Sequence, residues 1–243
     1  EKAIRRRLIE AHTRGLEAAY DSVDDAASLQ AQAEQLIFEV GDTGAATEHT
    51  RSAKSVITDA LVRLDQRKTQ GRIGIPTGFA DLDEIIGGLK RGDVYMLAGR
   101  TSMGKTAAAC NIAEHVAIVE GRDVLFVSLE MNSDEIGDRL LASQARVDSW
   151  LIQEGRYNKD HVQSLLRAGE RVSSAPLYID DYHTRTVGQI ASLARRQKRR
   201  ERLDVLFVDY LQLIVPDNPQ DPRQEKVAQI SSRLKGLARE LQV

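Results

Sequence analysis

The chain has 243 residues, of which 42% are hydrophobic and 29% are charged, and its formal net charge is −2. This composition is typical of one sizeable globular domain with a smaller appendage, and it excludes a strongly basic protein that coats DNA. The single cysteine, Cys110, excludes an internal disulfide and a four-thiolate metal site, and its apolar neighbours predict a small buried residue. No apolar run reaches the length of a membrane span, so we expect a cytoplasmic protein with no membrane contact.

The first 40 residues predict two helices. Apolar residues recur at helical spacing around Leu8 and again around Leu36, and acidic and small residues at 21–25 separate the two stretches. The simplest interpretation of residues 1–40 is a helical hairpin. Two short helices bury little core, so the hairpin either belongs to something larger or packs on a partner.

Residues 41–71 are interpreted as a linker that contains an amphipathic helix. The Gly-Asp-Thr-Gly sequence at 41–44 breaks the preceding pattern, and a helix is expected from about 48 to 68. Its apolar stripe comprises Val56, Ile57, Ala60, Leu61 and Leu64. The stripe either packs on its own domain or docks on another subunit, and the residues alone favour neither.

From residue 72 the pattern alternates between strand and helix. Short apolar runs predict strands at 94–98, 124–129, 177–179 and 205–208. Helices are expected between them, the first running to about Glu120, the next capped by Asn132, and a third from about 186 to 200. Apolar strands that alternate with helices predict a mainly parallel α/β sheet for residues 72–243.

The loop after the first predicted strand carries the clearest functional motif. Gly99-Arg100-Thr101-Ser102-Met103-Gly104-Lys105-Thr106 matches the phosphate-loop pattern G-x-x-x-x-G-K-[ST] between a strand and a helix. Backbone N–H groups of such a loop and the helix N-terminus bind phosphate oxygens. Lys105 is expected to reach the outer phosphates of ATP or a close relative, and the Thr106 hydroxyl to bind Mg²⁺.

Two carboxylates follow predicted strands at the same edge of the sheet. Ligands of open α/β sheets bind outside the carboxyl ends of the strands, where Glu130 and Asp209 both fall. Asp209 follows four apolar residues, as a Walker B aspartate does, and is expected to hold Mg²⁺. Glu130 is placed to activate the attacking water.

Several segments together resemble one family. The sequence Thr77-Gly78-Phe79 with the later Gly87-Gly88-Leu89 resembles the region before the phosphate loop of RecA-like ATPases. The segments 102–107, 128–131 and 209–213 narrow the resemblance to the bacterial replicative DNA helicases of the DnaB family. The helical run at 230–241 is similar as well, so the resemblance covers almost the whole chain.

The resemblance implies a RecA-like P-loop NTPase that works as a homo-hexameric ring on single-stranded DNA at a replication fork, with primase and a helicase loader as possible partners. It implies that ATP is bound by residues 99–107, Ala107 included, with Lys105 and Glu130 catalytic and Thr106 and Asp209 holding Mg²⁺. The stretch 1–40 resembles the end of the family's N-terminal helical domain. The helix near 48–68 resembles the family's linker helix, which favours docking on a neighbouring subunit.

Two departures qualify the resemblance. Thr101 stands where the family usually has proline. The family also continues past the position of Val243 with another strand, a glutamine-bearing sensor, DNA-contacting loops and basic fingers. Residues 72–243 are therefore expected to be an incomplete ATPase domain, and the chain alone a weak or inactive ATPase.

Basic residues offer two candidate DNA contacts. The cluster at 195–202 lies at a helix C-terminus, where cations are favourable, so we interpret it as a solvated helix end. Arg223 and Lys226, close to the proline-containing loop after Asp209, are the better DNA candidates. Two other functions stay open: another RecA-like ATPase, such as a recombination mediator or clock-type enzyme, and a docking module in which nucleotide binds without turnover.

Overall fold

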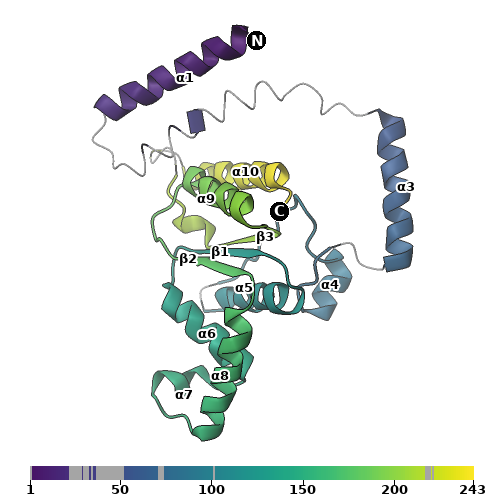
Figure 1. The fold of residues 1–243 in the computed structure, drawn as a ribbon, viewed down its shortest axis with the longest axis vertical. Helices are drawn as coiled ribbons and strands as arrows, with labels where there is room; N and C mark the ends of the chain where they lie inside the picture. Colours follow the sequence, from purple (N-terminus) through teal and green to yellow (C-terminus); the bar gives the residue numbers. More distant parts are fainter. Residues whose placement is uncertain are drawn as a thin grey trace. The chain divides into compact units, whose positions relative to one another are not determined.

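The computed structural model describes residues 2–21, 29, 33, 35–36, 52–70, 74–100, 102–216, 220 and 222–243. The chain divides into two compact units, residues 1–71 and 72–243. The three-part division into hairpin, linker and ATPase domain stays a prediction. Figure 1 shows the helices and strands along the chain.

Among its described residues, the first unit contains two long helices. Helix α1 spans Lys2–Asp21, and helix α3 spans Ala53–Gln70, so the linker helix begins later than the sequence predicts. Three residues of its stripe are exposed, Ile57 at 59%, Leu61 at 61% and Leu64 at 55% of full exposure. Most of the second predicted helix, the break at 41–44 and the residues just before 52 lie outside the described residues.

The second unit is built on a parallel sheet of three strands. These are β1 (Val124–Ser128), β2 (Leu177–Asp180) and β3 (Val205–Asp209), in the order β2-β1-β3. Val124 pairs with Leu177 on one side and with Val205 on the other. Every residue of β1 is buried, as expected for a central strand covered on both faces. The α/β class with a mainly parallel sheet is confirmed.

Helices cover both faces of this sheet, α5 and α6 one face and α9 and α10 the other. The helices of this unit are α4 Ala80–Ile86, α5 Lys105–Glu114, α6 Ser133–Ala145, α7 Ser149–Gln153, α8 Lys159–Ser173, α9 Val187–Arg200 and α10 Arg223–Leu241. Helix α5 continues as a π-helical turn, His115–Val119, and a 3₁₀ turn spans Leu211–Leu213. Asn132 caps α6 through Glu135 N–H, as predicted, and Thr186 caps α9.

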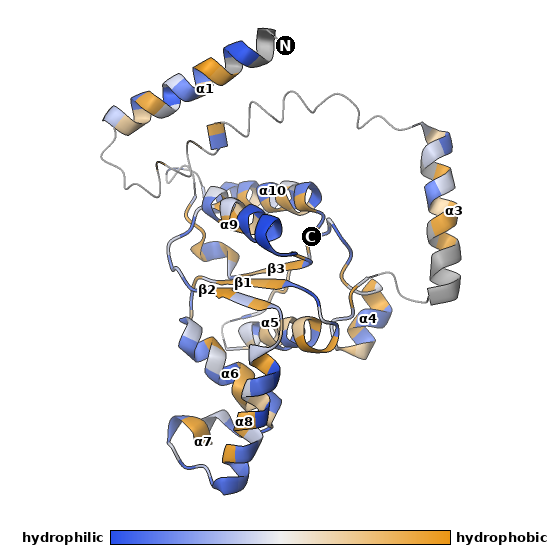
Figure 2. Ribbon diagram, in the orientation of Figure 1, coloured by the Kyte–Doolittle hydropathy of each residue, from blue (hydrophilic) through white to orange (hydrophobic). Residues whose placement is uncertain are grey.

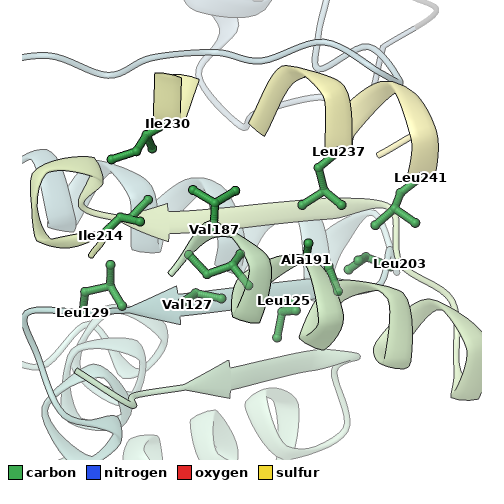
Figure 3. Close-up of a cluster of buried hydrophobic side chains, with 12 residues drawn as sticks. Leu125, Val127, Leu129, Val187, Ala191, Leu203, Ile214, Ile230, Leu237 and Leu241 are labelled. Carbon is green, nitrogen blue, oxygen red and sulfur yellow. The ribbon is translucent and has the colours of Figure 1, made fainter. Parts of the chain in front are cut away.

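Side chains of β1 alternate between two hydrophobic cores. Leu125 and Val127 pack with residues of α9 and α10, such as Ala191 and Leu237 (Figure 3). Val124 and Phe126 pack on the opposite face with α5 and α6, and the ring of Phe126 stacks on that of Phe207 at 5.7 Å between centroids. Successive side chains point to opposite faces, and both faces are covered, so strands β1 and β3 are hydrophobic along their length in Figure 2.

The prediction of a strand at 94–98 is wrong. These residues form no strand in the structure, and Tyr95, Met96 and Leu97 are 42%, 62% and 58% exposed. The physical reason is pairing, because an apolar run becomes a strand only when neighbouring backbone groups bond to it. Among the described residues, the edge of β3 that faces away from β1 pairs with no strand, and neither does the segment 94–98.

The basic cluster on α9 is only partly the solvated helix end that we expected. Arg195 donates two hydrogen bonds to the carboxylate of Glu240 on α10, at 2.8 and 2.9 Å, and Lys198 donates to the carbonyl of Leu241. These contacts lie between α9 and α10. Part of the cluster therefore joins two helices of the fold instead of facing solvent.

Candidate nucleotide-binding site

The phosphate loop leads directly into helix α5. Gly104 is the N-cap residue with φ of 81°, a left-handed conformation that favours glycine, and its carbonyl accepts the first helical bond from Ala108. Ser102 also has a positive φ of 63°, and Met103 N–H donates to the Arg100 carbonyl at 3.3 Å. Thr101 lies outside the described residues. The loop thus bends tightly and ends at a helix N-terminus, the arrangement that binds phosphate.

The Lys105 ammonium group binds two carbonyl groups of its own loop. Its Nζ atom donates to the Gly99 carbonyl at 3.0 Å and to the Arg100 carbonyl at 3.1 Å. A phosphate would compete with these two carbonyl oxygens for the same ammonium hydrogens. Lys105 therefore already points into its own loop, where a phosphate group is expected.

The two predicted carboxylates are neighbours across the sheet. Ser128 pairs with Asp209, and Leu129 N–H donates to the Asp209 carbonyl at 2.7 Å. Glu130 is the next residue after this hydrogen bond. Glu130 is exposed, whereas Asp209 is 7% exposed. The strand-end rule for parallel sheets thus places both residues at one edge.

Asp209 shows a feature that fits a cation. Its Oδ2 atom is buried and has no hydrogen-bond partner among the described residues. A buried acceptor without a partner costs free energy, and a metal ion or its water removes that cost. Thr106 supplies a half-buried hydroxyl on the first turn of α5. An oxygen-only pair of this kind suits Mg²⁺, which is bound by few protein ligands plus water and phosphate.

One cavity of about 1950 Å³ brings most of the predicted residues together. Its lining includes Gly99, Arg100, Ser102, Gly104, Lys105, Thr106, Ala107, Glu130, Asp209 and Arg223. Met103 and Lys226 do not line it. Small-molecule pockets usually measure about 300–1000 Å³, so a nucleotide would occupy only part of this space. Arg139 of α6 also lines the cavity, and no local pattern in the sequence marks it.

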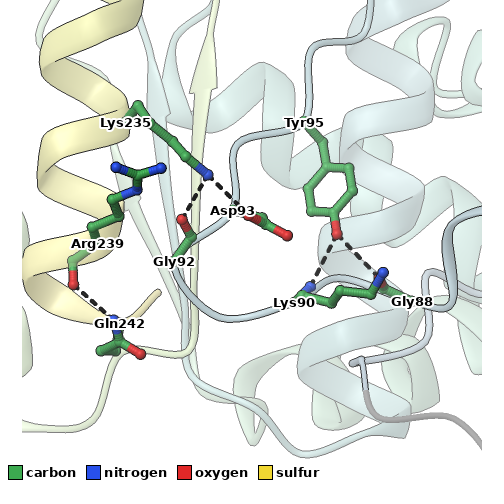
Figure 4. Close-up of polar contacts among 8 residues, drawn as sticks. All are labelled: Gly88, Lys90, Gly92, Asp93, Tyr95, Lys235, Arg239 and Gln242. Carbon is green, nitrogen blue, oxygen red and sulfur yellow. Dashed lines mark hydrogen bonds and ion pairs between the residues drawn. The ribbon is translucent and has the colours of Figure 1, made fainter. Parts of the chain in front are cut away.

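A polar cluster that the sequence analysis missed fixes the start of the segment leading to the phosphate loop (Figure 4). Lys235 of α10 donates to the Gly92 carbonyl and to the Asp93 carboxylate, both at 2.9 Å. Tyr95 Oη donates to the Gly88 carbonyl at 3.3 Å. The hydrogen bond from Lys235 holds the pKa of Asp93 below its usual value. The contacts of Lys235 join residues far apart in the chain, so no local motif could reveal them.

Cys110 lies on α5 within the core. It is 4% exposed, and burial raises the pKa of its thiol to about 11. The prediction of a buried core residue is therefore confirmed. A buried, protonated thiol of this kind is a poor nucleophile at neutral pH.

The DNA-contact candidates lie at the first turn of α10. Arg223 is the first residue of the helix and is exposed, and Lys226 is half-buried one turn later. Part of the loop before them lies outside the described residues. Their contact with DNA stays a prediction.

The three-layer fold, the phosphate loop and the strand-end carboxylates define the class of RecA-like P-loop proteins. A family model, the DnaB-like helicase C-terminal domain, matches residues 74–243. The chain belongs to this family of DnaB-like helicases.

Sequence relatives agree with this assignment. The replicative DNA helicase DnaB of Nostoc sp. is 37% identical to the chain over 250 aligned positions, covering 100% of the chain and 28% of the relative. The replicative DNA helicase DnaC of Bacillus subtilis is 35% identical, with 100% of the chain and 54% of the relative covered. The chain thus spans about half the length of such relatives, or less.

Solved structures give the same result. One solved ATPase domain is similar with a TM-score of 0.70 and 33% identity, over 77% of this chain and 68% of that one. A DnaB-like replicative helicase, described with its interactions with primase, has a TM-score of 0.70 and 29% identity, over 99% of this chain and 56% of that one. Among the residues that the structure describes, no helix combines the length and apolar character needed to cross a bilayer.

Proposed function

We propose that the chain is the ATP-hydrolysing part of a replicative DNA helicase subunit, which couples hydrolysis to translocation on single-stranded DNA and to duplex unwinding. The observation that carries the proposal is the site at the sheet edge. Asp209, whose buried Oδ2 atom has no hydrogen-bond partner among the described residues, lines the same cavity as the phosphate loop and Glu130. The similar relatives are named replicative DNA helicases, and this supports DNA unwinding as the use of the hydrolysed ATP.

Nucleotide binding in this proposal falls to residues 99–107. Their backbone N–H groups and the N-terminus of α5 bind the phosphates of ATP, and Lys105 exchanges its two carbonyl contacts for the outer phosphates. Thr106 and Asp209 would hold Mg²⁺, which neutralises charge on the phosphate oxygens when it is bound. Thr101 belongs to the proposed set through the motif alone.

Glu130 is the proposed general base. It follows a buried strand, is exposed at the cavity, and makes no hydrogen bond or ion pair with any described residue. A carboxylate that is free of such partners can accept a proton from the attacking water. The buried Asp209 is better suited to charge neutralisation than to proton transfer, since its free oxygen fits a cation.

The partners of the proposed helicase are single-stranded DNA and further copies of the same chain in a hexameric ring. Arg223 and Lys226 are the proposed DNA contacts, because α10 begins after the loop that leaves the Asp209 strand. Primase and a loader are proposed as further partners. One of the similar solved helicases is described together with primase.

The test is steady-state ATPase of the full-length protein with and without single-stranded DNA. The wild type should be stimulated by DNA. The variant Glu130→Gln should bind a fluorescent ATP analogue with unchanged affinity while turnover falls by about 10²-fold or more. Glu154→Gln makes the same change of carboxylate to amide at an exposed residue at the end of α7. It is the matched control and should behave as wild type.

DNA-stimulated turnover that survives Glu130→Gln would remove Glu130 from the mechanism. Turnover that ignores DNA would favour another RecA-like ATPase. Nucleotide binding without any turnover in the wild type would favour the docking module.

A further inference from the structure

Glu130 sits on a short loop that joins β1 to α6. Because its side chain contacts no described residue through a hydrogen bond or ion pair, the position of its carboxylate depends on the backbone of residues 129–132. Positioning matters for proton transfer, since a misplacement of about 1 Å can cost about 10²-fold in rate. The contacts that fix this loop are therefore functional candidates.

The buried side chain of Ser128 bonds to the backbone of this loop. Its Oγ atom accepts a hydrogen bond from Met131 N–H at 3.1 Å and donates one to the Met131 carbonyl at 2.7 Å. Ser128 is fully buried, at 0% exposure. Both bonds end on the residue that directly follows Glu130, so they fix the turn that presents it.

The outer side of the loop is tied to the neighbouring strand. The Asp181 carboxylate follows the last residue of β2, and its Oδ2 atom accepts a hydrogen bond from Ser133 N–H at 2.8 Å. This bond and a second one from the Ser133 side chain lower the pKa of Asp181, so the carboxylate is ionised at neutral pH. Strand β2 pairs with β1, so the tie connects the rigid sheet to the first residue of α6.

The bond to Asp181 is not needed to cap the helix. Asn132 already caps α6 by accepting from Glu135 N–H at 2.8 Å. The Ser133 N–H group is in an exposed setting, where water could satisfy it at little cost. What water could not supply is a fixed distance between the end of β2 and the start of α6.

We infer that Asp181 and Ser128 are positioning residues that hold the Glu130 carboxylate for attack of water on the bound nucleotide. Leu129 N–H is bonded to the Asp209 carbonyl of β3, and Met131 N–H is bonded to Ser128. Ser133 N–H is bonded to Asp181, at the end of β2. Glu130 is thus held between three anchored residues. The inference rests on the proposed role of Glu130 as the general base.

The experiment compares Asp181→Ala and Asp181→Asn in the full-length protein by steady-state ATPase and by binding of a fluorescent ATP analogue. Asp181→Ala should lower kcat by about tenfold or more, with KM and ATP affinity changed less than about twofold. Asp181→Asn should recover most of kcat, because the amide oxygen can still accept from Ser133 N–H. Glu170→Ala, which removes an exposed carboxylate on α8, is the control and should change neither parameter.

A double variant separates positioning from stability. If Asp181 acts through Glu130, then Asp181→Ala added to Glu130→Gln should not reduce the residual turnover further. A further tenfold loss in the double variant, or a normal kcat for Asp181→Ala, would overturn the inference. Near-normal turnover of Glu130→Gln alone would instead refute the proposed function on which the inference rests. If Asp181→Ala fails to fold, Ser128→Ala tests the same loop from its inner side with the same readouts.

Discussion

Replacement of Lys105 by alanine tests the phosphate loop most directly. In the structure the ammonium group donates to the carbonyls of Gly99 and Arg100, at 3.0 and 3.1 Å. Binding exchanges these contacts for phosphate oxygens. Attraction between unit charges about 4 Å apart is about 4 kcal/mol at an effective dielectric constant near 20, and each carbonyl bond given up is worth about 1 kcal/mol. The net loss is therefore about 2 kcal/mol, or roughly 30-fold in affinity.

The measurement is calorimetric titration of Lys105→Ala with a non-hydrolysable ATP analogue and Mg²⁺. Lys159→Ala, which removes an exposed lysine at the start of α8, is the matched control and should bind as wild type. The melting temperature of Lys105→Ala should stay close to that of the wild type, since the two lost bonds are exposed. An affinity within about twofold of wild type in a folded Lys105→Ala protein would refute the assignment of the phosphate site.

Three further predictions concern the second unit. Ile190 is fully buried at 0% exposure, so Ile190→Ala should lower the free energy of unfolding by about 2–5 kcal/mol in urea titrations, and a loss under about 1 kcal/mol would contradict the core assignment. Burial raises the pKa of Cys110 to about 11, so at pH 8 only about one thiol in a thousand is ionised and a thiol reagent should react only after unfolding; rapid reaction of the native protein would disprove this. The pKa of Asp93 is lowered by Lys235, so the ion pair stabilises the fold above the unfolded-state pKa of about 3.9, and this contribution disappears as the pH falls through the lowered folded value. Asp93→Asn should therefore be less stable than wild type at pH 7, by about 0.2–1 kcal/mol for an exposed pair, and equally stable in acid; a stability difference that persists in acid would argue against the ion pair.

The class of fold was predictable because its signals are local. The runs at Val124, Leu177 and Val205 each begin a strand of the structure, and Asn132 caps the helix that the sequence places after it. Alternation of short apolar runs with helices restricts the topology to a parallel sheet. Hydrophobic pattern, capping residues and glycine turns all act within a few residues, so sequence alone can reveal them.

The segment 94–98 shows where such reasoning stops. Its composition is that of a strand, yet a strand exists only together with its neighbours, and the described residues provide none for it. The positioning contacts of Asp181 and Lys235 were missed for a related reason. Each reaches a backbone group that is distant in sequence, and only the folded topology brings the two together.

It was predictable that Glu130 and Asp209 lie at the same edge of the sheet, despite their separation in sequence. Both follow apolar strands, and parallel strands place their carboxyl ends at one edge. The register pairs Ser128 with Asp209, so the rule locates the carboxylates to within about one residue. Which of them is buried could not be predicted, since the exposure of Asp209 depends on the elements packed around the end of β3.

The central position of β1 has a consequence for synthesis on the ribosome. Val124 is translated well before Leu177 and Val205, the residues that pair with it on either side. During that interval the apolar segment Val124–Ser128 has two unpaired edges and no helix α9 or α10 to cover one of its faces. Exposed apolar strand edges promote association between nascent chains. The strand that is most protected in the folded protein is thus the one that most needs shielding, by a chaperone or by rapid translation of its two neighbours, while the chain is being made.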